Sequence, residues 1–272
     1  MELKSLKQKI NIKYFMAVYF ALAFLYAAIF FGGGPGSFKG LLIVILYPTY
    51  DLVWTYIRDK VWYFPLSSII SGFVIGIVSQ PNPSYLLIIL LPFLAVFSKQ
   101  LISFGKMRHV FNPAGFAMFV MSFFAPVVTW WATSWDLKMI VVILLISMFI
   151  LWKQERWHVA ISFLLSYIIF LALMLLIKGL DMSQILNAMD GQLINGTVLF
   201  FTTVMLIEPL TSSFPEKKHR IIYGLIIGFS ANLIALISGY ISFGHQNPLI
   251  LGLLLGNLTA SLLFLPRRKQ IA

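Results

Sequence analysis

The chain has 272 residues, of which 60% are hydrophobic and only 11% are charged. Water-soluble domains carry about 25% charged residues, so this composition excludes a soluble globular protein and indicates an integral membrane protein. The absence of cysteine excludes cysteine-held iron–sulfur clusters, disulfides and thiol nucleophiles. A net charge of +11 would suggest nucleic acid in a soluble protein, but here the basic residues follow membrane topology and we expect no nucleic-acid partner.

Apolar runs bounded by charges or by Gly, Pro and Asn clusters predict an all-α polytopic membrane protein with about ten transmembrane helices in the lipid bilayer. The predicted spans are residues 14–31, 40–57, 66–79, 85–97, 110–130, 139–152, 159–177, 196–209, 221–241 and 248–265. Because each span takes ~20 residues, the remainder holds only loops and tails. Residues 1–272 are therefore expected to form a single membrane domain.

Basic residues fall almost entirely on alternate connecting segments. Counted from the N-terminal tail, one set of segments holds 17 of the 20 Lys and Arg residues, and the other holds only Lys39, Lys138 and Lys178. The positive-inside rule then places both termini in the cytoplasm. We expect a protein of the cell inner (cytoplasmic) membrane, with basic cytoplasmic tails at residues 1–13 and 266–272.

Two pairs of spans favour an internal repeat. Five spans plus five spans would enter the membrane from opposite sides, which predicts inverted repeats of residues 14–130 and 139–265. Spans 66–79 and 196–209 are both short, and two later spans contain the helix starts Asn112-Pro113 and Asn247-Pro248. Capping by Asn and Pro explains these starts by itself; alternatively, the paired N-termini face a ligand near the midplane.

The short spans 66–79 and 85–97 are joined by Gln80-Pro81-Asn82-Pro83-Ser84. They form either two full spans or a re-entrant hairpin, and both arrangements leave the number of crossings even.

A basic segment precedes Asn112-Pro113. It contains Lys99, Lys106, Arg108 and His109. Basic side chains before a capped helix start are typical of an anion site for a phosphate or a negatively charged headgroup. An ordinary cytoplasmic loop that obeys the positive-inside rule is the alternative.

Two acids lie within or at the end of apolar spans. Glu208 ends a span and is followed by Pro209, which interrupts the helix and frees carbonyl groups. Asp51 is the most deeply embedded acid of the chain. Such a carboxylate needs a cation partner or has a functional role. Lys60 or Lys99 is the expected partner of Asp51, proton or sodium handling is the alternative, and Glu208 either has a partner or snorkels to the interface.

The histidines do not favour a transmembrane haem. His109, His158, His219 and His245 all fall at predicted membrane edges, whereas a bis-histidine haem needs facing histidines inside the spans. We therefore expect no haem.

Three stretches of the sequence resemble a known family of redox membrane proteins. They are Phe64–Gly72, Ser98-Lys99 leading into His109–Ala114, and Phe200–Ser212. The motifs His-x-Phe-Asn-Pro-Ala and Met-x-x-Glu-Pro-x-Thr are similar to those of RnfD, a membrane component of the Rnf electron-transport complex, and of NqrB, its counterpart in the sodium-pumping NADH:quinone reductase. The resemblance covers about residues 45–240 and identifies the chain as a short, stand-alone member.

The resemblance implies ten spans built as an inverted repeat similar to that of urea transporters, and a role in passing electrons through flavins, with ion movement coupled to that flow. Family members hold FMN covalently on the last threonine of a Ser/Thr-Gly-Ala-Thr site, which this chain lacks; Asn195-Gly196-Thr197 differs from it. We therefore expect FMN, riboflavin or a quinone to bind noncovalently. The candidate cofactor-binding residues are Lys99, Arg108, His109, Asn112, Pro113 and Thr211.

Two other functions stay open. The chain has no nucleotide-binding domain for NADH, so a redox role requires other membrane or soluble redox proteins as partners. A transporter or channel of the same fold would move a small solute or ion without redox chemistry, with Asp51, Glu208 and Asn247 as candidate residues of the pathway. A structural anchor that docks soluble partners on its basic face would tolerate Asp51→Asn and Glu208→Gln.

Overall fold

The structure is a computed structural model that describes residues 11–32, 34–103, 109–133, 137–194, 196–240 and 244–264. The described residues are 76% helical, and they contain no β-strand, only an isolated antiparallel bridge between Ser103 and His109. The predicted all-α class is confirmed. The two basic tails, apart from residues 11–13, lie outside the described ranges.

The helices of the first half are α2 (Ile12–Phe30), α3 (Gly40–Asp59), α4 (Leu66–Val78), α5 (Tyr85–Leu101) and α6 (Pro113–Met121), with a 3-10 turn, η1 (Pro35–Lys39), before α3. The second half contains α7 (Leu137–Gln154), α8 (Trp157–Ile177), α9 (Met182–Ile194), α10 (Thr197–Phe200), the π-helical turn η2 (Phe201–Met205), α11 (Pro209–Ser212), α12 (Lys217–Ile237) and α13 (Pro248–Leu263).

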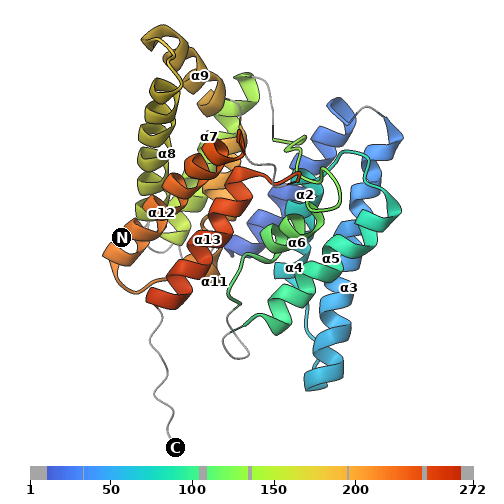
Figure 1. The fold of residues 1–272 in the computed structure, drawn as a ribbon. Coiled ribbons are helices and arrows are strands. Elements are labelled where there is room, and N and C mark those ends of the chain that lie inside the picture. The colour runs from blue at the N-terminus through green and yellow to red at the C-terminus, as the bar shows by residue number, and fades with distance from the viewer. Residues whose placement is uncertain are drawn as a thin grey trace, which may run out of the picture.

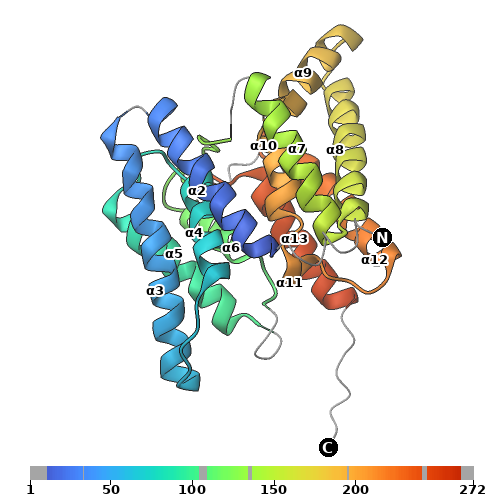
Figure 2. The ribbon, with the colours of Figure 1, turned by 180° about the vertical axis from the view of Figure 1, so that it is seen from behind.

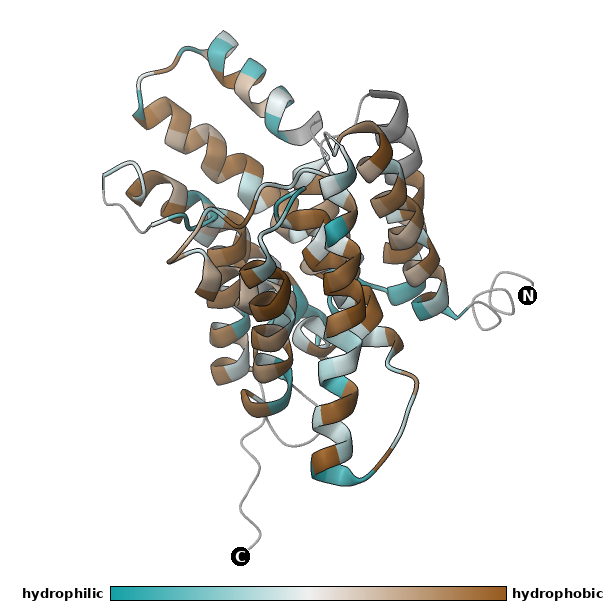
Figure 3. Cartoon of the chain, turned by 90° about the vertical axis from the view of Figure 1, so that its right-hand side faces the viewer, coloured by the Kyte–Doolittle hydropathy of each residue, from teal (hydrophilic) through white to brown (hydrophobic). Residues whose placement is uncertain are grey.

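In the part of the chain that the structure describes, four helical segments are long and apolar enough to cross a membrane: Ile12–Phe30, Pro35–Asp59, Trp157–Ile177 and Lys217–Ile237. Their outward faces carry large apolar side chains, and Figure 3 shows hydrophobic residues dominating the long helices. Leu22, Ile45 and Ile169 are more than half exposed. An apolar surface of this extent is stable only against lipid or another protein, which agrees with the predicted membrane protein.

Figures 1 and 2 show two groups of helices side by side, α2–α5 in one and α7–α9 with α12 in the other, with α6 and α13 between them. The packing partners correspond: α3 packs on α5 and α5 on α6, as α8 packs on α12 and α12 on α13. The two middle helices, α6 and α13, also contact each other.

Glycines bring α12 against α8. A Cβ atom on Gly228 would lie 2.8 Å from both the Phe163 carbonyl oxygen and the Tyr167 nitrogen, and one on Gly224 would lie 2.5 Å from the Val159 carbonyl oxygen. Gly-xxx-Gly spacing places both glycines on one face of α12. In membranes such small residues allow helix backbones to approach closely and gain van der Waals contact.

The predicted span 110–130 is wrong in its second half. Helix α6 ends at Met121, and residues 122–133 form turns and irregular chain. Pro126 cannot continue a helix. This irregular segment instead lies against the C-terminal end of α4, where the backbone N–H groups of Thr129 and Trp130 each donate to the Val78 carbonyl at 3.0 Å.

Two further elements are too short to cross a bilayer alone. Helix α4 has 13 residues, or about 20 Å at 1.5 Å per residue, against a hydrocarbon core of about 30 Å. The predicted span 196–209 forms α10 followed by the π-helical turn η2. Thr202 and Thr203 hydroxyls in this turn donate to carbonyls one turn back, those of Val198 and Leu199.

Helix α9 was not predicted, because residues 178–195 lack a long apolar run. Its start is a capping box: the Gln184 N–H donates to the Asp181 carboxylate at 2.9 Å, and the Asp181 N–H donates to the Gln184 side chain at 3.0 Å. The hydrogen bonds from Gln184 and Ser183 lower the pKa of Asp181. The spacing Asp-x-x-Gln was the signal in the sequence.

Gly228→Ala is expected to destabilise the protein by about 1–3 kcal/mol, because its new methyl group overpacks the α8 contact. Unfolding in denaturant of the detergent-purified variant measures this loss. Gly191→Ala on α9 is the matched control, because a Cβ there meets nothing within 4 Å; it should be neutral or slightly stabilising. Equal stability of the two variants would contradict the close α8–α12 contact.

Candidate functional site

The first polar cluster surrounds Asp51 on α3, whose side chain is fully buried. The Lys99 ammonium on α5 lies 2.6 Å from Oδ2 of Asp51 and also donates to the Ser68 hydroxyl. Ser68 on α4 donates to the same oxygen at 2.6 Å, and Gln100 Nε2 donates to Oδ1 at 2.7 Å. The Tyr63 hydroxyl also donates to Asp51. Side chains of α4 and α5 thus donate to a carboxylate carried by α3.

This geometry decides between the two expected partners of Asp51. Lys99 forms the ion pair, whereas Lys60 lies over the Tyr56 ring, 5.3 Å from its centroid. Partial burial, followed by the hydrogen bond to Asp51, raises the pKa of the Tyr63 phenol, so Tyr63 remains a donor. Lys99 therefore neutralises a carboxylate of the chain itself rather than facing an open anion site.

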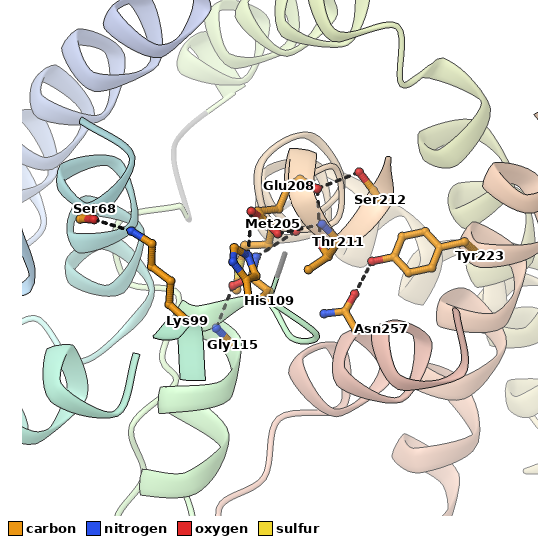
Figure 4. Close-up of polar contacts among 11 residues, drawn as sticks. Ser68, Lys99, His109, Gly115, Met205, Glu208, Thr211, Ser212, Tyr223 and Asn257 are labelled. Atoms are coloured by element: carbon orange, nitrogen blue, oxygen red, sulfur yellow. Dashed lines mark hydrogen bonds and ion pairs between the residues drawn. The ribbon is translucent and has the colours of Figure 1, made fainter. Parts of the chain in front are cut away.

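The second polar cluster joins the two halves of the chain. His109 Nε2 lies 3.1 Å from Oε1 of Glu208, and the other carboxylate oxygen of Glu208 accepts the Thr211 N–H at 3.2 Å. Asn112 Nδ2 donates to the Met205 carbonyl at 3.2 Å. Figure 4 shows these contacts between the start of α6 and the turn that leads into α11.

The Asn-Pro helix starts serve as caps, and one of them does more. Asn112 accepts the Gly115 N–H at 3.0 Å, with Pro113 as the first residue of α6. The same side chain also donates to the carbonyl of Met205, 93 residues away, so it holds the irregular end of η2. Asn247 accepts the N–H groups of Leu249 and Ile250 and caps α13.

A cavity of about 280 Å³ lies beside the second cluster, and we call it the α11-side cavity. Its walls come from α2, α4, the start of α6, the end of α7, η2 and α11, so both halves contribute. The walls are mostly apolar. The polar groups that line it are Lys13, Ser67, Ser71, Asn112, Gln154 and Glu208. The Oε1 atom of Gln154 is buried and has no hydrogen-bond partner among the described residues.

The structure separates the candidate residues into three places. Asn112 and Glu208 line the α11-side cavity, and His109 and Thr211 contact Glu208. Asp51 and Lys99 form the separate first cluster. Asn247 lies at the opposite end of the molecule, at the start of α13, whose other end packs Phe264 against Phe214 beside α11. Arg108 lies outside the described residues.

Several further polar residues, most of them near α11, were not predicted from the sequence. Arg156 is 8% exposed and donates to the Ser212 carbonyl at the end of α11. Tyr223 donates to Asn257, which links α12 to α13 behind α11. Ser68 completes the first cluster. Polar residues inside apolar runs are the signal that could have found Ser68 and Asn257.

A search of protein-family models finds no match to this chain, and a search of curated proteins finds none either. Within the described ranges, no three His, Asp or Glu side chains gather as a metal site would require. The two polar clusters and the cavity beside the second one are therefore the candidate site.

Lys99→Met is expected to cost about 3–5 kcal/mol of unfolding free energy, because it leaves the Asp51 carboxylate buried without its cation. The double variant Asp51→Asn/Lys99→Met should recover most of that loss, since a neutral amide at position 51 needs no cation. Denaturant unfolding measures both. Lys60→Met, which removes an exposed lysine, is the control and should change stability by less than about 1 kcal/mol. A double variant as unstable as Lys99→Met would refute the pairing.

Proposed function

We propose that the chain is a multi-pass inner-membrane protein with about ten full or partial crossings, both termini in the cytoplasm and two inverted halves. The start of α2 and the end of α13 lie at the α11 end, since Ile12 lines the cavity with Glu208, and Phe264 packs on Phe214. The corresponding packing of α3–α5–α6 and α8–α12–α13 supports the repeat.

The function that this arrangement supports best is that of an electron-transport subunit of the Rnf and sodium-pumping NADH:quinone reductase type, which binds a flavin or quinone noncovalently. The observation that carries this proposal is the α11-side cavity, which has apolar walls and a polar margin. Cofactor pockets combine apolar walls with a few polar groups that orient the ligand. The resemblance at His109–Ala114 and Phe200–Ser212 points to the same place.

The residues fit the ring system of such a cofactor better than the whole molecule. The cavity, at about 280 Å³, is slightly smaller than the usual range of about 300–1,000 Å³. Ile70, Val74 and Val204 would pack on the ring, and the unpartnered Gln154 Oε1 would accept a ring N–H or a quinol hydroxyl. Lys13, an exposed residue of the lining at the start of α2, would receive a flavin phosphate at the edge of the cavity.

When bound, the cofactor would supply reversible electron transfer. The chain's own contribution is to hold the ring between its two halves and to fix the charges beside it. The contact between His109 and Glu208 holds that carboxylate at the cavity margin. Electrons would come from partner redox proteins.

A spectrum of the detergent-purified protein tests this proposal. We expect visible flavin absorbance and fluorescence, or saturable fluorescence quenching by an added short-chain quinone. After acid precipitation, flavin in the supernatant means noncovalent binding, whereas flavin in the pellet would mean covalent attachment. If the protein binds none of FMN, riboflavin and quinone, the redox proposal is refuted.

Ser67→Trp is expected to lower flavin or quinone affinity at least tenfold, because the indole fills the cavity that Ser67 lines. The matched control is Thr49→Trp, since Thr49 is exposed on α3 and does not line the cavity. Titration of each purified variant with the cofactor measures the affinity. Equal loss in both variants would place the ligand elsewhere.

A transporter without redox activity is the second candidate. The observation that favours it is the buried Asp51–Lys99 pair within the helices, because intramembrane ion pairs often mark ion or proton pathways. Proteoliposomes distinguish the two: a transporter predicts solute or ion flux from a colourless protein, and flux should fall in Asp51→Asn.

A further inference from the structure

A second cavity lies at the opposite end of the molecule, beneath α9, and we call it the α9-side cavity. Its volume is about 340 Å³. It is enclosed by α8, α12, the start of α13 and the segment Thr129–Trp130, with Gln192 of α9 at its edge. It shares no lining residue with the α11-side cavity.

Among the described residues, the polar groups that line this cavity are uncharged: Thr129, Trp130, Tyr167, Gln192, Thr197, Asn232 and Asn247. Leu171, Met174 and Pro248 supply apolar surface between them. A charged ligand would lose its hydration without gaining an opposite charge, which costs several kcal/mol per ion. The lining therefore selects neutral molecules.

Two side-chain amides that line the cavity keep one hydrogen-bonding atom each for a ligand. The amide N–H groups of Asn232 donate to the carbonyls of Tyr167 and Gly228, both at 3.0 Å, so its Oδ1 is left as an acceptor. Asn247 uses Oδ1 to cap α13 and keeps its Nδ2 as a donor. Both amides lie in one cavity, which suits a ligand group that donates and accepts, such as a hydroxyl or a carboxamide.

Trp130 is held in a strained position at this cavity. Its φ of 56° lies in the left-handed region, which is costly for a bulky side chain. Its backbone N–H donates to the Val78 carbonyl, and its side chain packs edge-on against Phe201. The Trp130 Nε1–H is buried and has no partner within the described ranges. Such strain persists only where the surrounding structure fixes the residue, and it is common at ligand sites.

We propose that the α9-side cavity binds a small uncharged solute rich in hydroxyl or amide groups, of monosaccharide size or less. Asn232 Oδ1 accepts from the solute and Asn247 Nδ2 donates to it. Trp130 and Tyr167 supply aromatic surface. The hydrogen bond from the Tyr167 hydroxyl to Gln192 Oε1, at 3.2 Å, holds α9 over the bound solute.

Saturation-transfer NMR on the protein in lipid nanodiscs tests this site with three probes: D-glucose, glycerol and acetamide. We expect saturable transfer to at least one probe, and the responding probe shows whether the site prefers a polyol or an amide. The same preparation is assayed for flavin or quinone binding, so a failure here is separate from a failure of the proposed redox function. No saturable transfer to any of the three probes overturns the proposal.

Two variants locate the bound probe. Ala235→Phe should abolish binding, because Ala235 lines the cavity and the ring fills it without removing a polar group. Asn247→Asp keeps the cap, since Asp caps helices as well as Asn, but it replaces the Nδ2 donor; it should weaken binding at least tenfold.

Thr259→Val, on the same helix as Asn247 but outside the cavity lining, should bind the probe as the unaltered protein does. Thermal melting of each variant confirms that it is folded. Probe binding that survives both Ala235→Phe and Asn247→Asp, or that is lost equally in Thr259→Val, refutes the assignment to this cavity.

Discussion

The short helices α4, α6 and α10–η2 end inside the molecule, and their terminal peptide groups must find partners there because lipid offers none. The arrangement of the other elements depends on which groups supply these hydrogen bonds. The Val78 carbonyl at the end of α4 accepts the backbone N–H groups of Thr129 and Trp130. The start of α6 is capped by Asn112, which also reaches the Met205 carbonyl at the end of η2. Hydrogen bonds thereby connect the end of each short helix to a segment far away in the sequence.

The same irregular ends gather the charged side chains of the interior. Glu208 caps α11 and contacts His109, so a carboxylate at the break in the second half is held by a residue of the first half. Asp51 lies apart, in a cluster shared by α3, α4 and α5. Breaking a buried pair costs more than forming it gains, so these clusters fix the arrangement of the helices more than they add to stability.

The two cavities differ in chemistry as well as in place. The α11-side cavity is mostly apolar, with Lys13 and Glu208 in its lining, and it lies between the two halves. The α9-side cavity has an uncharged polar lining and lies mainly within the second half. The π-helical turn η2 lies between them, since Val204 and Met205 at its end line the first cavity and the Phe201 ring at its start packs against Trp130 of the second. A redox ligand and a neutral solute would thus occupy separate sites on either side of the π-helical turn.

The sequence by itself determined the membrane class, the position of most helices, the capped starts at Asn112 and Asn247, and the choice of Lys60 or Lys99 for Asp51. These follow from local hydropathy, capping chemistry and the cost of an unpaired charge in lipid. The tertiary structure alone decided that Lys99 is the partner, that residues 122–133 leave the helix to pair with α4, that His109 meets Glu208, and where the cavities lie. Those features depend on contacts between residues roughly 50 to 100 positions apart, and the period of an apolar run carries no information about such contacts.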